Sequence, residues 1–183
     1  LIAANLGATG LAALTGVIVA ATGPAAPLVV LIAVSLTGGV LLLPTSVTSG
    51  AGRISDRVDL GSPPVSALWA WDCSVKTSAA ATIGRTLRLF WAGASASSGT
   101  AGTDGLYSEI DQAISAIDRL RNLNPMGIVV ADTTSNPGTF VGSGLVEIRR
   151  QYIQAAFWND LNATLSATAT DFTLTLTPVP DSF

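Results

Sequence analysis

The chain has 183 residues, of which 11% are charged, with a net charge of −3 at pH 7 and no histidine. This acidic balance argues against nucleic acid as the main partner, because nucleic-acid binding usually needs a basic surface. The single cysteine, Cys73, excludes an intramolecular disulfide and any metal site built from several cysteines. Without histidine, nucleophile systems that use a histidine base are excluded as well.

Charge is distributed unevenly along the chain. Residues 1–52 carry none, and the first charged residue is Arg53. We therefore expect two parts: an uncharged apolar N-terminal arm over residues 1–52 and a folded domain over residues 53–183. Serine, glycine and proline accumulate in Thr45–Pro64, which is typical of a boundary between two such parts.

Within the arm, two apolar runs, Leu11–Thr22 and Leu28–Leu43, flank the turn-forming segment Gly23–Pro27. One interpretation is a transmembrane hairpin, but a spanning helix needs about 20 apolar residues, and Gly38-Gly39 interrupts the second run. The other is an extended, strand-forming arm, which the valine, isoleucine and threonine content favours. Because so much apolar surface needs a partner, we expect the arm to be buried against other subunits, with a membrane as the alternative.

The clearest strand of the domain is Val65–Thr77. Its alternation places Trp69, Trp71, Cys73 and Val75 on one face. Large apolar side chains on a single face are typical of a half-buried sheet, to which tryptophans add a large buried area. The functional alternative is that these tryptophans are exposed and stack on a ligand.

A second strand is expected over Arg85–Trp91, with Leu87, Leu89 and Trp91 directed inward. Only a short connection separates it from the strand over residues 65–77. We therefore predict that these two strands pair with each other in antiparallel fashion.

A glycine- and serine-rich loop, Gly93–Gly105, precedes a helix predicted over residues 109–121. No lysine follows the glycines, so the loop lacks the phosphate-binding P-loop pattern. Asn124-Pro125 would end the helix. Three isoleucines share one face of this helix: Ile110, Ile114 and Ile117.

Four further strands complete the domain, over Met126–Ala131, Thr139–Arg149, Tyr152–Trp158 and Asp171–Thr177. Gly142 and Gly144 interrupt the second of these, which indicates a β-bulge. In the last, Phe172, Leu174 and Leu176 share the face opposite the threonines, the pattern of an antiparallel sheet with one buried face. The predicted fold class is mainly β: an antiparallel β-sandwich or jelly roll with one short helix and an extended apolar N-terminal arm.

Four carboxylates lie close together in the sequence: Asp104, Glu109, Asp111 and Asp118. They suggest two functional hypotheses, a catalytic pair of acids or a calcium site. EF-hand spacing is absent, and a turn followed by a solvated helix face explains the cluster more simply. Ser143 lies in Gly-Ser-Gly rather than in a nucleophile-elbow motif. We therefore predict no catalytic, cofactor-binding or metal-binding residues, no cofactor and no enzymatic activity.

Two further motifs have plain explanations. Asn162-Ala163-Thr164 fits a glycosylation sequon, which is weak by itself. Arg149-Arg150 could pair with acids on a neighbouring subunit, but a solvated pair is the simpler reading.

The order of elements, together with two segments, carries a resemblance to a known group. Arg149–Asn159 reads RRQYIQAAFWN, and Phe172–Asp181 reads FTLTLTPVPD. An arginine- and tyrosine-containing strand, a polar turn and a last strand ending near Thr-Pro-x-Pro-Asp resemble small structural proteins of tailed bacteriophages. The similarity covers roughly residues 65–183 and is a pattern rather than a signature motif.

This resemblance implies a β-sandwich located on the virion, as a capsid decoration (cement) protein or a tail or fibre accessory protein. The implied partners are other virion proteins, such as the major capsid or tail protein, and copies of the chain itself, with no nucleic acid. Two other functions stay open. One is a small membrane-inserted protein with the arm as a hairpin, and the other is a carbohydrate-binding module that uses Trp69, Trp71 or Trp91 if any of them is exposed.

Overall fold

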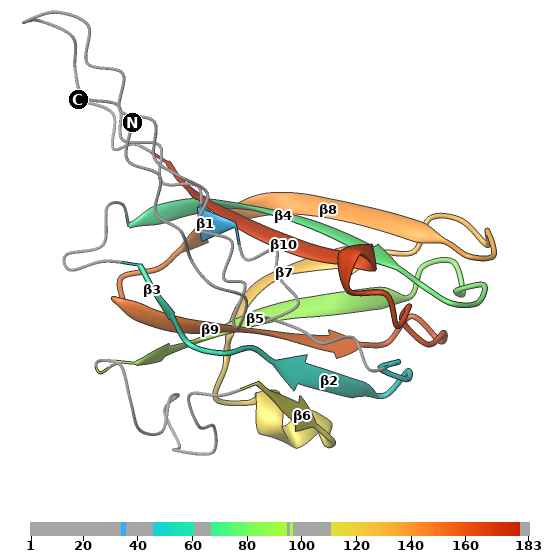
Figure 1. Ribbon diagram of the computed structural model, residues 1–183, viewed down its shortest axis with the longest axis horizontal. Coiled ribbons are helices and arrows are strands. Elements are labelled where there is room, and N and C mark those ends of the chain that lie inside the picture. Colours follow the sequence, from blue (N-terminus) through green and yellow to red (C-terminus); the bar gives the residue numbers. More distant parts are fainter. Residues whose placement is uncertain (1–33, 36–45, 61–66, 95, 97–110, 180–183) are drawn as a thin grey trace, which may run out of the picture.

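The computed structural model describes residues 34–35, 46–60, 67–94, 96 and 111–179. Within these ranges the chain forms strands and two short 3-10 helices (Figure 1). The elements are β1 (Val34–Ser35), β2 (Ala51–Ile54), β3 (Val58–Asp59), β4 (Leu68–Lys76), β5 (Thr86–Ala94), β6 (Gln112–Ile114), η1 (Ile117–Leu120), β7 (Asn124–Val130), β8 (Thr139–Glu147), β9 (Tyr152–Asn159), η2 (Ala169–Asp171) and β10 (Phe172–Pro178).

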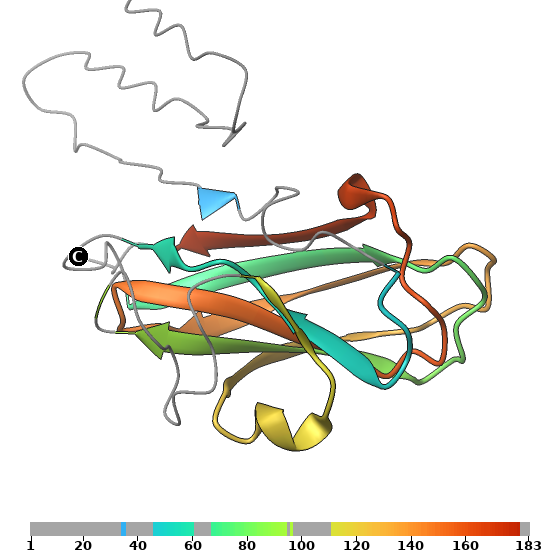
Figure 2. The ribbon, with the colours of Figure 1, turned by 60° about the horizontal axis from the view of Figure 1, so that its bottom comes forward.

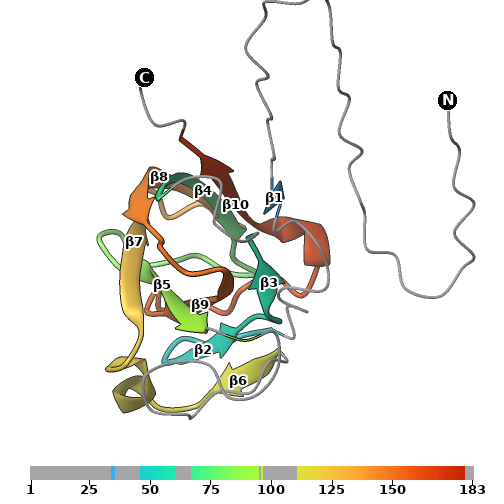
Figure 3. The same cartoon turned by 90° about the vertical axis from the view of Figure 1, so that its left-hand side faces the viewer.

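The strands form two antiparallel sheets that pack face to face, so the predicted mainly β, sandwich-like architecture is confirmed. Sheet A has the order β1-β10-β4-β8, and sheet B has the order β6-β2-β9-β5-β7, with β3 also pairing with β9. Viewed along the strands, the two sheets lie as separate layers, and β7 and β8 lie next to each other where the sheets meet (Figure 3). The apolar runs of the N-terminal arm lie outside the described residues, apart from Val34 and Ser35.

The main core lies between the sheets and follows from strict alternation along the strands. In β4 the residues Trp69, Trp71, Cys73 and Val75 are all buried, as the sequence predicts. They face inward-pointing residues of sheet B, such as Leu87, Leu89, Ile153 and Phe157. Phe157 of β9 and Phe172 of β10 join the sheets directly, with ring centroids 5.0 Å apart and an angle of 30° between the rings.

A second, smaller core covers the outer face of sheet B. After the edge strand β6, the chain turns under the sheet, and η1 lies below it (Figure 2). Ile114 and Leu120 from this segment pack with Ile54, Ala156 and Trp158 from the sheet. Strand β9 is therefore buried on both faces, and the two sets of side chains that its alternation separates enter two different cores.

The predicted helix over residues 109–121 is wrong. In its place the described residues form strand β6 and the short 3-10 helix η1, and no α-helix occurs in the described ranges. The physical reason is tertiary pairing: Ile114 lies opposite Gly52 in the sheet, and Asp111 forms a bidentate pair with Arg53, with nitrogen–oxygen distances of 3.1 and 2.7 Å. Ile117, which the helix would have buried, is 49% exposed.

The predicted antiparallel pair of residues 65–77 and 85–91 is also wrong. Strand β4 pairs with β10 and β8 in sheet A, whereas β5 pairs with β9 and β7 in sheet B. The segment that connects β4 to β5 therefore crosses from one sheet to the other. Two backbone hydrogen bonds hold it in place: the Thr82 N–H donates to Leu161 O at 3.1 Å, and the Gly84 N–H donates to Ala131 O at 2.8 Å.

The bulge expected at Gly142 and Gly144 does not occur. Strand β8 pairs with β4 in unbroken register from Thr139 to Glu147. The glycines instead make room for the indole of Trp71, because a Cβ at Gly144 would lie 2.8 Å from Trp71 Nε1.

The sandwich includes residues that precede the first charged residue. Val47 is buried in the main core, and its carbonyl oxygen accepts hydrogen bonds from Leu165 N and Asn159 Nδ2, both at 3.0 Å. The onset of charge at Arg53 lies inside strand β2. A truncation that preserves the folded unit must therefore begin before Val47.

Candidate functional site

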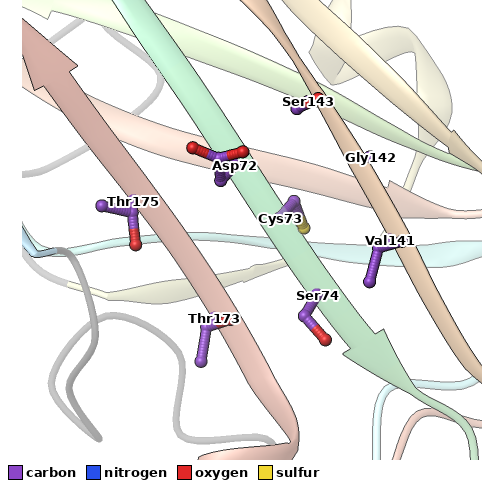
Figure 4. A pocket seen from close by; sticks show the side chains of 8 residues that line it. All are labelled: Asp72, Cys73, Ser74, Val141, Gly142, Ser143, Thr173 and Thr175. Atoms are coloured by element: carbon purple, nitrogen blue, oxygen red, sulfur yellow. The ribbon is translucent and has the colours of Figure 1, made fainter.

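The outer face of sheet A carries a hollow that is open to solvent. It has a volume of about 380 Å³. Three adjacent strands line it (Figure 4). The lining residues are Asp72, Cys73 and Ser74 of β4, Val141, Gly142 and Ser143 of β8, and Thr173 and Thr175 of β10.

Strand register explains why these side chains meet. Asp72 lies opposite Thr175 on one side and Ser143 on the other, which makes a polar row across sheet A. Side chains that lie opposite each other on one face of a sheet are close neighbours. In this row the Asp72 carboxylate can accept hydrogen bonds from a ligand, and the hydroxyl groups of Ser143 and Thr175 can both donate and accept them. Among the described residues that line the hollow, Asp72 is the one titratable group at the surface, and no lysine or arginine lies beside it to stabilise developing negative charge.

The thiol at this site is inert. The Cys73 side chain belongs to the main core and is 3% exposed, so only part of the residue borders the hollow. Burial raises the pKa of the Cys73 thiol from 9.0 to about 12. The thiolate, which is the nucleophilic form, is therefore scarce at neutral pH.

We predict that a thiol reagent at pH 8 labels Cys73 only as fast as the domain opens, and that Cys73→Ala removes all labelling. The unfolded thiol ionises near pH 9 and the folded one near pH 12. The stability that depends on the neutral thiol is thus fully present below pH 9 and is lost as the pH rises from 9 to 12. The difference in unfolding free energy between the wild type and Cys73→Ala should shrink over this interval. Rapid labelling of the folded protein would contradict the assignment.

The carboxylate cluster considered in the sequence does not assemble a site in the described residues. Asp111 is taken up by Arg53, and its backbone N–H donates to Asp56 Oδ1 at 2.7 Å. Asp118 lies exposed in η1. Asp104 and Glu109 lie outside the described residues. Across the described ranges, no group of three or more potential metal-ligating side chains occurs.

The remaining sequence candidates have structural roles or lie on the surface. Trp69 and Trp71 are buried, and Trp91 is partly buried against the main core, so Trp69 and Trp71 offer no stacking surface. Arg149 bonds to Glu147 on the surface. Asn162 lies exposed in the connection from β9 to β10, where its Nδ2 donates to Thr82 Oγ1 at 3.0 Å.

The alternation in the sequence placed Asp72, Ser74 and the threonines of β10 opposite the buried residues of their strands, but it assigned no face to Ser143 and did not identify these residues as a group. Asp72, Ser143 and Thr175 come from three strands that are distant along the chain. The only signal was the alternation within each strand, which says which face a residue occupies and not which strand lies beside it.

No known protein-family model matches this chain, and no curated protein matches it significantly. In the described ranges no helix is long and apolar enough to cross a membrane, and the two apolar runs of the arm lie almost entirely outside those ranges.

Proposed function

We propose that the domain is a jelly roll. The support is the order of the strands: β1-β10-β4-β8 in one sheet faces β2-β9-β5-β7 in the other. The chain alternates between the sheets, crossing from β4 to β5, from β7 to β8, from β8 to β9 and from β9 to β10. Eight strands wound in this way are the arrangement of double-sheet jelly rolls, which are frequent in viral capsid and lectin domains.

We propose further that the chain is a non-enzymatic structural protein of a virion, acting as a capsid decoration (cement) protein held by contacts between subunits. The observation that carries this proposal is the combination of the jelly-roll strand order with an uncharged N-terminal segment that joins sheet A at β1, beside β10. A fold alone does not fix a function. The apolar arm supports a role in binding, because its surface needs a partner. The class of particle, a phage virion, is supported by the resemblance to phage structural proteins of two segments, Arg149–Asn159 and Phe172–Asp181.

Three alternative functions fit the described residues to different degrees. A carbohydrate-binding module would be supported by exposed tryptophans, but Trp69 and Trp71 are 0% and 4% exposed, and Trp91 is partly buried against the main core. No aromatic side chain of the described residues lines the hollow. A tail or fibre accessory protein shares every observation above and differs only in where the protein binds the particle. For the membrane-inserted alternative, the two apolar runs remain the only support.

Deleting residues 1–33 should leave a folded domain that no longer binds the particle. The cut keeps β1 and Val47, so both sheets retain their described strands. Each fully buried valine, leucine or isoleucine that the deletion removes would have contributed about 1.5–3 kcal/mol to attachment before ordering costs. Co-sedimentation with particles lacking the protein measures the loss, and thermal unfolding checks the fold.

A matched pair of full-length variants separates apolar burial from chain length. Val17→Asp combined with Val19→Asp should weaken particle binding, whereas Val17→Ile combined with Val19→Ile should preserve it. Particle binding by the deletion variant at full strength would refute the role of the arm. Partitioning of the full chain into liposomes without any particle would favour the membrane alternative.

A further inference from the structure

The edge strand β8 lacks the features that normally protect a sheet edge. Among the described edges, β1 and β6 are two and three residues long, and β7 carries Pro125, which cannot donate a backbone hydrogen bond. Strand β8 is nine residues long and has no proline, and Glu147, its last residue, is its only charged one. Long, uncharged edges of this kind are templates for pairing with another chain.

Among the described strands β8 pairs only with β4, and its backbone groups that face away from β4 form a regular row. The Ile148 N–H donates to Ala67 O at 2.8 Å, and Gly138 O accepts from Thr77 N at 2.9 Å, so even-numbered residues face β4. Because backbone groups alternate in an antiparallel ladder, the odd-numbered residues direct their N–H and C=O groups away from β4. The same odd-numbered residues direct their side chains to solvent, and Val141 and Leu145 are 74% and 62% exposed.

We infer that β8 pairs with β8 of a second copy of this chain, antiparallel about a two-fold axis at Ser143. Val141 and Leu145 lie at equal sequence distance on either side of Ser143, so each Val141 faces the Leu145 of the other copy. The two exposed apolar side chains of each copy thereby pack against those of the other as cross-strand pairs, and sheet A continues across both molecules. Such an interface is isologous, as a closed dimer requires.

Charge complementarity supports the same register. In this pairing Glu147 of one copy lies opposite Thr139 of the other, and Thr139 lies beside Lys76 of β4 on the same face. Lys76 keeps 38% of its side chain exposed, and its ion pair with Asp171 is 3.5 Å long. The carboxylate of Glu147, which also bonds to Arg149 of its own chain, thus comes near the Lys76 ammonium group of the other copy at both ends of the interface.

The inference deepens the proposed function, since it names a contact between copies that the assembly would use. Its test uses the purified full chain without particles. A monomeric result would leave particle binding untouched, and failure of particle binding would leave the dimer untouched.

Cysteine crosslinking tests the axis directly. Ser143→Cys should form an intermolecular disulfide under mild oxidation, because paired residues of adjacent strands have Cα atoms about 5.5 Å apart. Thiols held together in a dimer have an effective concentration on the order of 1 mM, so at about 10 μM protein the crosslink should form about 100-fold faster than by collision. Ala113→Cys measures the rate of crosslinking by random collision. Ala113 is exposed on β6, the edge strand of sheet B that lies away from β7 and β8.

Register is tested by two single-cysteine variants. Val141→Cys and Leu145→Cys should each crosslink poorly alone but rapidly when the two proteins are mixed. Buried Cys73 is present in every variant and gives a constant background. Ser143→Cys crosslinking no faster than Ala113→Cys overturns the inference, as does equal self-crosslinking by Val141→Cys.

A charge exchange provides a second, independent readout by sedimentation velocity. Leu145→Lys alone should dissociate the dimer, because it places a charge against Val141 of the other copy. The double variant V141E/L145K should restore it, since each introduced acid then faces an introduced base. A double variant that stays as monomeric as the single one, or a wild-type chain that sediments as a monomer, overturns the inference. If β8 is instead covered by residues 1–33 of another copy, Ser143→Cys will not crosslink to itself, which also overturns it.

Discussion

Replacing Asn159 by leucine should destabilise the domain by about 3–5 kcal/mol, because three buried hydrogen bonds are lost together and two groups, Ala163 O and Leu161 N, are left without a partner at about 1–3 kcal/mol each. Val47 O keeps its bond from Leu165 N. Asn159 Nδ2 donates to Val47 O at 3.0 Å and to Ala163 O at 2.9 Å, and its Oδ1 accepts from Leu161 N at 3.0 Å. Asn159 is 0% exposed, so water cannot replace these bonds. One side chain therefore joins the end of β9 to the segment before β2 and to the turn after β9. Urea unfolding measures the change.

A matched control and an isosteric variant sharpen this prediction. Asn124→Ala removes an exposed amide whose bond to Trp91 O is 3.5 Å long, and it should cost less than about 0.5 kcal/mol. Asn159→Asp keeps the shape of the side chain but places a carboxyl against two carbonyl oxygens. Burial raises the pKa of such a carboxyl above its unfolded value of about 3.9.

The sign of the pH dependence follows from that raised pKa. Relative to the wild type, Asn159→Asp should be least destabilised below about pH 4, where the group is neutral in both states. The deficit should grow as the pH rises through the folded-state pKa and then level off. A deficit for Asn159→Asp that does not change with pH, or a cost below about 1 kcal/mol for Asn159→Leu, would show that this network is not a main support of the fold.

The strand faces could be predicted from the sequence because period-two alternation is a local property. Phe172, Leu174 and Leu176 are all buried, as their spacing predicts, and the threonines between them are partly exposed. The same rule assigned Trp69 and Trp71 to the core. These predictions needed no knowledge of which strands are neighbours.

The helix prediction was wrong because its pattern was ambiguous and tertiary contacts decided it. Ile114 could sit on a helical face or in a strand, and isoleucine is a good strand residue. Pairing with Gly52 and the bidentate contact between Asp111 and Arg53 stabilise the strand. Both partners lie more than fifty residues away in the sequence, so no local rule includes them.

The predicted pairing of the strands over residues 65–77 and 85–91 was wrong for a related reason. A short connection favours a hairpin, yet β4 and β5 lie in different sheets. The hollow could not be predicted either, because Asp72, Ser143 and Thr175 come together only through the strand order β10-β4-β8. The composition excluded histidine-based chemistry from the start, while the shape of the surface depended on long-range pairing.

The glycines predicted to form a bulge instead belong to a seam where β7 and β8 meet over Trp71. A Cβ at Gly127 would lie 2.1 Å from Trp71 Cζ2, and one at Gly144 would lie 2.8 Å from Trp71 Nε1. The indole is 4% exposed, and its Nε1 has no hydrogen-bond partner in the described part of the chain. The large side chain therefore fits only because its neighbours on two strands have no side chains.

Gly127→Ala should accordingly destabilise the domain by about 3 kcal/mol, at the upper end of overpacking costs, since the added methyl overlaps a ring that has no room to move. In a Trp71→Leu background the same substitution should cost close to nothing, because the overlapping atoms are gone. A double-mutant cycle by urea unfolding should therefore give a coupling of about 2 kcal/mol or more.

Gly84→Ala is the control for this cycle. Gly84 has φ +81° with open space where a Cβ would lie, so alanine there should cost about 1 kcal/mol through backbone strain alone. That cost should be the same with Trp71 or with leucine at this position, because Gly84 does not contact the indole. If Gly127→Ala behaves like Gly84→Ala and costs the same in both backgrounds, the seam tolerates a methyl group and Trp71 does not depend on its glycine neighbours.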